Sequence, residues 1–142
     1  MQHIVVGIDG SAASRRALHW AVDHARMSGA DLQVIHAWTV PDLGADPLAG
    51  MIAAPAELEA QARRELDLVL AGVDERALPG RIEPTLVRNA PAKALLDAAK
   101  GVDLLVVGSR GLGVGNAALV SVSHRVISEA SCPVVVVPPD SP

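Results

Sequence analysis

The stretch Val106–Val126, VVGSRGLGVGNAALVSVSHRV, predicts a strand, a glycine-rich loop and an amphipathic helix in succession. The loop contains four glycines within eight positions: Gly108, Gly111, Gly113 and Gly115. Glycine lets backbone N–H groups approach a ligand that a Cβ would exclude, and a helix N-terminus adds a partial positive charge. The loop therefore predicts an anion site, with phosphate as the natural guest, although any tight strand-to-helix turn also favours glycine.

The glycine pattern matches neither of two common phosphate motifs. A P-loop needs a lysine and a Ser or Thr directly after its last glycine, and the lysines of this chain are Lys93 and Lys100. The dinucleotide fingerprint opens the first strand–helix unit of its fold, whereas this loop lies in the last unit.

Outward from this stretch, apolar strands alternate with amphipathic helices. Strands are predicted at Ile4–Ile8, Asp31–Trp38, Ile82–Arg88, Val102–Val107 and Val134–Val137. Helices are predicted between Ser11 and Ser28, from Ala56 to the Pro79-Gly80 break, from Pro91 to Ala99, and through Leu119, Val122, Val126 and Ala130. We expect one α/β domain over residues 1–142, with three layers: an open, parallel five-stranded sheet of order 3-2-1-4-5 and two helices on each face.

This strand order brings the loop after the first strand, Asp9-Gly10-Ser11, next to the glycine-rich loop. Ligands of such sheets bind at the carboxyl ends of the strands, where the winding direction reverses. A carboxylate opposite a phosphate loop suits a nucleoside, because Asp9 can accept hydrogen bonds from an adenine amine or a ribose hydroxyl.

Composition excludes several function classes. Half of the 142 residues are hydrophobic and the net charge is −4, so no basic patch indicates a nucleic-acid partner. Two Trp and no Phe or Tyr leave little for bases or a flavin to stack on. No apolar run reaches the length of a membrane span and no signal peptide is recognisable, so we expect a cytoplasmic protein without a membrane partner.

Other reactive residue types form no recognisable catalytic or metal-binding pattern. Cys132 is the single cysteine and is interpreted as structural. Ser121 and Ser123 lack a histidine base with an orienting carboxylate nearby in sequence, and helix capping is the commoner role of such serines. The histidines lack metal-ligand spacing and are interpreted as surface or packed residues: His3, His19, His24, His36 and His124. We therefore predict no catalytic residue and no metal.

Five segments make the chain from Ile4 to Pro138 resemble the universal stress protein family. They are IVVGIDGS, LQVIHAW, PAKALLDAA, DLLVVGSRG and SVSHRVISEASCPVVVVP. The resemblance implies a Rossmann-like domain that binds ATP or a related adenine nucleotide such as AMP or cyclic AMP. It also implies a non-catalytic role in the stress response, exerted through partner proteins that the sequence does not identify, and a homodimer.

The resemblance also implies a set of nucleotide-binding positions. Asp9 matches the acidic residue near the adenosine, and Ala37 matches a backbone position beside the base. The strand end and loop match residues that frame ribose and phosphate, and the start of the last helix matches residues that meet phosphates. The implied site comprises Gly7, Ile8, Asp9, Ala37, Val107, Gly108, Arg110, Gly111, Gly113, Ser121, Val122 and Ser123.

The chain departs from the family's phosphate motif, which is G-x-x-G, then nine residues, then G-S or G-T. Eight residues separate Gly111 from Val120, and Val120 stands in the usual glycine position before Ser121. Valine does not readily adopt positive φ, and its branches occupy space where phosphate oxygens approach the backbone. We expect weakened phosphate binding, unless Gly113 and Gly115 re-route the loop.

Three functions are compatible with these observations. The first is a nucleotide-binding regulatory module, and the second is a structural dimer of the same fold that has lost nucleotide binding. The third is a slow ATPase, which would need metal-holding carboxylates or a base at the loop, where only Asp9 is available. The apolar terminal strand Val134–Val137 is expected at a sheet edge, where pairing with a second copy would form the homodimer.

Overall fold

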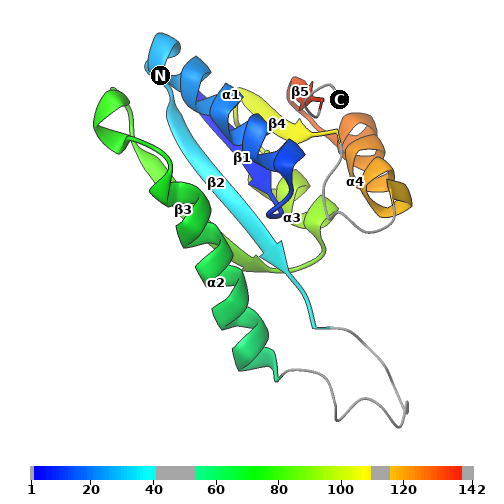
Figure 1. Ribbon diagram of the computed structural model, residues 1–142. Coiled ribbons are helices and arrows are strands. Elements are labelled where there is room, and N and C mark those ends of the chain that lie inside the picture. The colour runs from blue at the N-terminus through cyan, green and yellow to red at the C-terminus, as the bar shows by residue number, and fades with distance from the viewer. Residues whose placement is uncertain (1, 41–53, 110–115, 139–142) are drawn as a thin grey trace, which may run out of the picture.

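The computed structural model describes residues 2–40, 54–109 and 116–138 (Figure 1). For residues 116–121 it describes the helical backbone but not the side chains. The strands are β1 (His3–Ile8), β2 (Asp31–Trp38), β3 (Ile82–Arg88), β4 (Leu104–Gly108) and β5 (Val134–Val137). The helices are α1 (Ala12–Ser28), α2 (Pro55–Ala71), α3 (Pro91–Ala98) and α4 (Asn116–Glu129), with a short 3₁₀ helix η2 (Glu75–Ala77).

The five strands form one parallel sheet in the order β3-β2-β1-β4-β5 (Figure 1). In the register of this sheet, Ile8 lies beside His36 and Val106 lies beside Val135. The strand order confirms the prediction, and it places the carboxyl ends of β1, β2 and β4 next to one another. Those three strand ends carry the predicted nucleotide site.

Two apolar layers cover the sheet. On one face, α1 and α2 bury residues such as Leu18 and Leu66 against β1 and β2. On the other face, α3 and α4 bury residues such as Leu95 and Val126 against β1, β2 and β4. Side chains of a parallel strand alternate between the two faces, so a sheet covered on both sides needs nearly continuous apolar strands. The predicted arrangement of two helices on each face is confirmed.

Helix α1 begins and ends where its capping residues require. The Ser11 hydroxyl accepts a hydrogen bond from the Ser14 N–H at 3.1 Å, which satisfies one of the free N–H groups of the first turn. Gly29 closes the helix with φ of 77°, and its N–H donates to the Ala25 carbonyl. Ser11 is thus the N-cap of α1, and Gly29 is its C-cap.

Two predicted boundaries, the start of β4 and the end of α2, were wrong by more than one residue. Strand β4 is Leu104–Gly108 and not Val102–Val107, because the Val102 N–H donates to the Ala99 carbonyl in the turn that follows α3. Helix α2 ends at Ala71, before the Pro79-Gly80 break, and η2 occupies part of the remaining segment. Val73 continues the helical spacing of apolar residues in the sequence, and the predicted helix therefore extended beyond Ala71.

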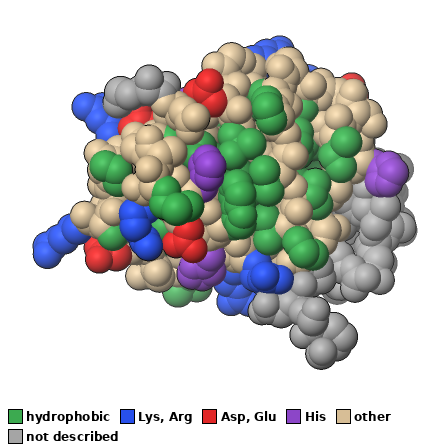
Figure 2. All heavy atoms as spheres, turned by 90° about the horizontal axis from the view of Figure 1, so that it is seen from above, with side chains coloured by type: hydrophobic (Ala, Val, Ile, Leu, Met, Phe, Trp, Pro, Cys, Tyr) green, Lys and Arg blue, Asp and Glu red, His purple; other side chains and the backbone are tan. Residues whose placement is uncertain are grey.

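The molecular surface mixes apolar and charged groups. Figure 2 shows hydrophobic side chains gathered at the centre of the face seen from above, with charged and histidine side chains around them. The exposed large hydrophobic side chains among the described residues are Trp20, Met27, Leu68 and Ile127. No helix in the described ranges is long and apolar enough to cross a membrane.

Candidate functional site

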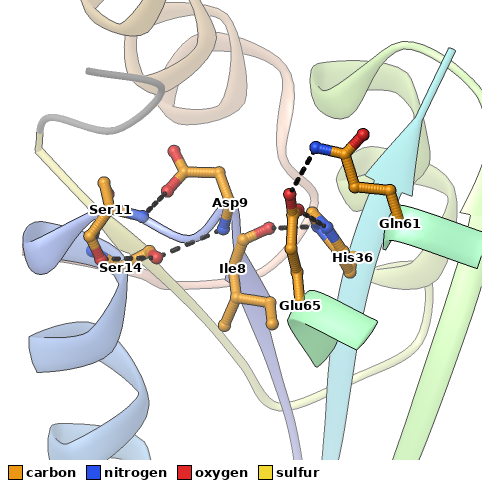
Figure 3. Close-up of polar contacts among 7 residues, drawn as sticks. All are labelled: Ile8, Asp9, Ser11, Ser14, His36, Gln61 and Glu65. Atoms are coloured by element: carbon orange, nitrogen blue, oxygen red, sulfur yellow. Dashed lines mark hydrogen bonds and ion pairs between the residues drawn. The ribbon is translucent and has the colours of Figure 1, made fainter. Parts of the chain in front are cut away.

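The loop between β1 and α1 is held in shape by its own side chains. The Asp9 carboxylate accepts a hydrogen bond from the Ser11 N–H at 2.8 Å, and the Asp9 N–H donates to the Ser14 hydroxyl at 3.2 Å (Figure 3). Gly10 has φ of 84°, a backbone conformation that residues other than glycine rarely adopt. No described residue donates to the second Asp9 oxygen, so this oxygen can accept a hydrogen bond from a ligand.

Ala37 lies at the carboxyl end of β2, directly beside this loop. Ile8 pairs with His36 in the sheet, so Asp9 leaves β1 beside Ala37, which is still paired with Val87 of β3. The sheet register therefore places Asp9 and Ala37 on adjacent strand ends, although 28 positions separate them in the sequence. Trp38 follows, and the guanidinium carbon of Arg88 lies 5.4 Å from the centre of its ring.

Two glycines of the predicted site have structural reasons to be glycine. A Cβ on Gly7 would lie 2.7 Å from the Leu95 side chain of α3. A Cβ on Gly108 would lie 2.9 Å from the backbone carbonyl carbon of Ala13 in the first turn of α1. Both glycines therefore let a helix approach the sheet closely, and Val107, the residue before Gly108, is buried in the core.

Helix α4 contributes one polar contact to the end of β4. Ser123 is buried, and its hydroxyl donates a hydrogen bond to the Gly108 carbonyl at 3.3 Å. Val122 is half-buried and packs against the cluster beneath α3 and α4. The loop positions Arg110, Gly111 and Gly113, together with the Ser121 side chain, lie outside the described residues.

The sequence interpretation missed the role of His36, which it treated as one of five packed or surface histidines. His36 is 5 % exposed, and its two ring nitrogens contact the Ile8 carbonyl at 3.1 Å and the Glu65 carboxylate at 2.8 Å. Gln61 donates to the other Glu65 oxygen at 3.4 Å. A readable signal existed, since a histidine interrupts an apolar strand and Gln61 and Glu65 share a helical face with Ala62.

A shallow cleft of about 170 Å³ opens beside this histidine, between the end of β2 and helix α2. Its walls mix apolar groups with amide, hydroxyl and carboxylate groups. The lining residues are His36, Ala37, Trp38, Thr39, Leu58, Gln61, Ala62 and Glu65.

The described residues contain no group of three or more His, Cys, Asp and Glu side chains placed to hold a metal ion. Burial, and secondarily the negative charge of Asp103, raises the pKa of the Cys132 thiol. A raised pKa disfavours the reactive thiolate, which agrees with the structural interpretation of this residue.

Comparisons of the sequence and of the structure with known proteins point to the same family. The sequence model of the Universal stress protein family matches residues 1–138. A universal stress protein of Mycolicibacterium smegmatis is 40 % identical over 137 residues, which cover 96 % of this chain and 45 % of that protein. A universal stress protein of Thermus aquaticus is 37 % identical, with coverage of 94 % and 96 %. The chain thus spans less than half of the mycobacterial relative and nearly all of the Thermus one.

Among solved structures, a universal stress protein in complex with cyclic AMP is similar to this chain throughout. The TM-score is 0.64, the sequence identity is 30 %, and the match covers 98 % of each chain.

Proposed function

Because this chain belongs to the universal stress protein family, we propose that it binds an adenine nucleotide at the carboxyl ends of β1, β2 and β4. It uses this binding as a regulatory module in the stress response and not as an enzyme. The Asp9 loop carries the proposal: one carboxylate oxygen is fixed by the Ser11 N–H and the other can accept from a ligand, beside the Ala37 backbone. The relative solved with cyclic AMP supports an adenine ligand.

The two halves of the proposed site are unequal. The adenosine half contains Asp9, Ala37 and Gly108, all of which match the family's pattern. The phosphate half contains the shortened segment from Gly111 to Ser121 with Val120 in place of glycine. We therefore propose that ATP holds little advantage over AMP or cyclic AMP in this protein.

Replacing Asp9 by alanine tests the adenosine half. The Asp9→Ala variant should bind adenosine about 10- to 150-fold more weakly, because a hydrogen bond to a charged group contributes about 1.5–3 kcal/mol. Titration calorimetry with adenosine measures the loss. Asp23→Ala is the matched control, since Asp23 is an exposed carboxylate of α1 that pairs with Arg26. Equal adenosine binding by the wild type and Asp9→Ala would refute the proposed role of this carboxylate.

A homodimer through β5 is the proposed assembly, because β5 is the last strand of the sheet and, among the described residues, pairs with β4 alone. The Leu105 N–H donates to the Pro133 carbonyl and the Ser109 N–H donates to the Val137 carbonyl. Backbone groups alternate in direction along a strand, so position 135 also faces β4, whereas Val134 and Val136 direct their N–H groups to the open edge.

A proline at position 136 should therefore block pairing at the edge without removing a hydrogen bond to β4. We expect a dimer mass for the wild type and a monomer mass for Val136→Pro in sedimentation experiments. Val135→Pro is the contrasting variant, because it removes a bond inside the sheet and should lower the midpoint of thermal unfolding. A Val136→Pro protein that remains dimeric would place the dimer interface elsewhere.

A structural dimer without nucleotide binding is the second candidate, and Val120 together with the shortened loop favours it. The two candidates differ in a simple observation. A chain that binds no nucleotide shows no heat on titration with adenosine and no thermal shift with AMP.

A further inference from the structure

A buried histidine joins three elements beneath the proposed adenosine site. His36 extends from β2 and is 5 % exposed. Its ring contacts both the last residue of β1 and the middle of α2. We call the three groups, the His36 ring, the Ile8 carbonyl and the Glu65 carboxylate, the His36 bridge (Figure 3).

The chemistry of the partners fixes the protons of the bridge. A carbonyl oxygen can only accept, so the Nδ1 atom of His36 carries a proton and donates it to Ile8. The contact between Nε2 and the Glu65 oxygen then needs one further proton, which the two groups share either as an imidazolium with a carboxylate or as two neutral groups. In both forms the ring has one orientation, because a flipped ring would lose its partners.

The bridge acts on the peptide unit that carries Asp9. The Ile8 carbonyl and the Asp9 N–H belong to the same planar unit. His36 binds the carbonyl side of this unit, and the Ser14 hydroxyl accepts from its N–H side. With both sides held, the unit cannot rotate, and the direction in which the Asp9 side chain leaves the strand is fixed.

The same residue bears on the second adenosine contact, because His36 directly precedes Ala37 in β2. We propose that His36 and Glu65 are positioning residues that set the Asp9 carboxylate and the Ala37 backbone for the base, an inference that rests on the proposed function. The Glu65 side chain is 40 % exposed, but the His36 ring is buried, and an apolar side chain could fill its space without the cost of burying a polar group. The His36 bridge instead lies where the orientation of the peptide between Ile8 and Asp9 decides whether an adenine nucleotide fits the site.

Three variants test the bridge by titration with adenosine and with ATP. Glu65→Ala should weaken the binding of both ligands by the same factor, about tenfold, because the effect acts on the base and not on the phosphates. Glu65→Gln should stay within about threefold of the wild type, since an amide still offers a hydrogen bond to Nε2. Val22→Ala is the matched control: Val22 is buried in α1, about three turns from the helix start that follows the Asp9 loop, so this variant should lose stability and keep adenosine affinity.

Two results would overturn the proposal. One is wild-type affinity in Glu65→Ala, and the other is an equal loss of affinity in Val22→Ala at the same loss of thermal stability. A purely structural role for the bridge predicts the second result.

Nuclear magnetic resonance separates this inference from the proposed function. In the ligand-free protein, Glu65→Ala should shift the backbone amide signals of Asp9 and Ala37, whereas Glu65→Gln should leave them near their wild-type positions. If the wild type takes up no adenosine, the proposed function fails, and these amide shifts still decide whether the bridge positions Asp9. Unchanged Asp9 signals in Glu65→Ala would overturn the bridge, whatever the protein binds.

Discussion

Inserting one residue between Gly111 and Val120 and replacing Val120 by glycine should tighten ATP binding by a factor of about ten to about 10⁴. The change restores the family's spacing and its glycine before Ser121. A glycine there lets phosphate oxygens approach backbone N–H groups at the start of α4, where the helix dipole favours an anion. One or two recovered charge-assisted hydrogen bonds, each about 1.5–3 kcal/mol, give the expected range. Titration calorimetry with ATP measures it.

Adenosine is the control ligand, because it lacks phosphates and its affinity should not change in the repaired variant. The matched control variant carries the inserted residue and keeps the valine, which separates the effect of loop length from that of the glycine. Tight ATP binding by the wild type, unchanged after the repair, would mean that Gly113 and Gly115 already rebuild the phosphate cradle.

Replacing Gly108 by alanine should lower the free energy of unfolding by about 1–3 kcal/mol, the usual cost of overpacking a filled site. The new Cβ would lie 2.9 Å from the carbonyl carbon of Ala13 and 3.0 Å from its oxygen. These are backbone atoms of the first turn of α1, so the whole helix end must move away from β4. Urea denaturation followed by circular dichroism measures the change.

Gly7→Ala is the matched control. Its new Cβ would also meet an atom at 2.7 Å, but that atom is the tip of the flexible Leu95 side chain, which can rotate. We expect a smaller loss of stability than in Gly108→Ala. Equal losses of unfolding free energy in the two variants would show that contact with the α1 backbone is not what disfavours a side chain at position 108.

Strand boundaries were predictable where the sequence marks them on both sides. Strands β2, β3 and β5 begin and end at the predicted residues, and β5, for example, is a run of four valines between two prolines. The start of β4 was not predictable, since Val102 is apolar and β-branched like a strand residue but donates its N–H to the Ala99 carbonyl in the turn after α3. The end of α2 was obscured by Val73, which continues the helical spacing beyond the helix.

The site was predictable only in part. Strand order alone placed Asp9 at the switch point, because the first and fourth strands must be neighbours for the winding to reverse. His36 could not be assigned a partner, since Glu65 reaches it only when α2 packs across β2. Sequence also could not tell a glycine required by a ligand from one required by helix packing, and Gly7 and Gly108 both have packing neighbours.

Titration of the wild-type chain with AMP and with ATP, under the same conditions, tests the proposed site most directly. Because the adenosine half matches the family and the phosphate half departs from it, we predict measurable AMP binding, with ATP no more than about tenfold tighter. Absence of binding by both nucleotides would contradict the proposal, and so would ATP binding that exceeds AMP binding by a factor of about a thousand.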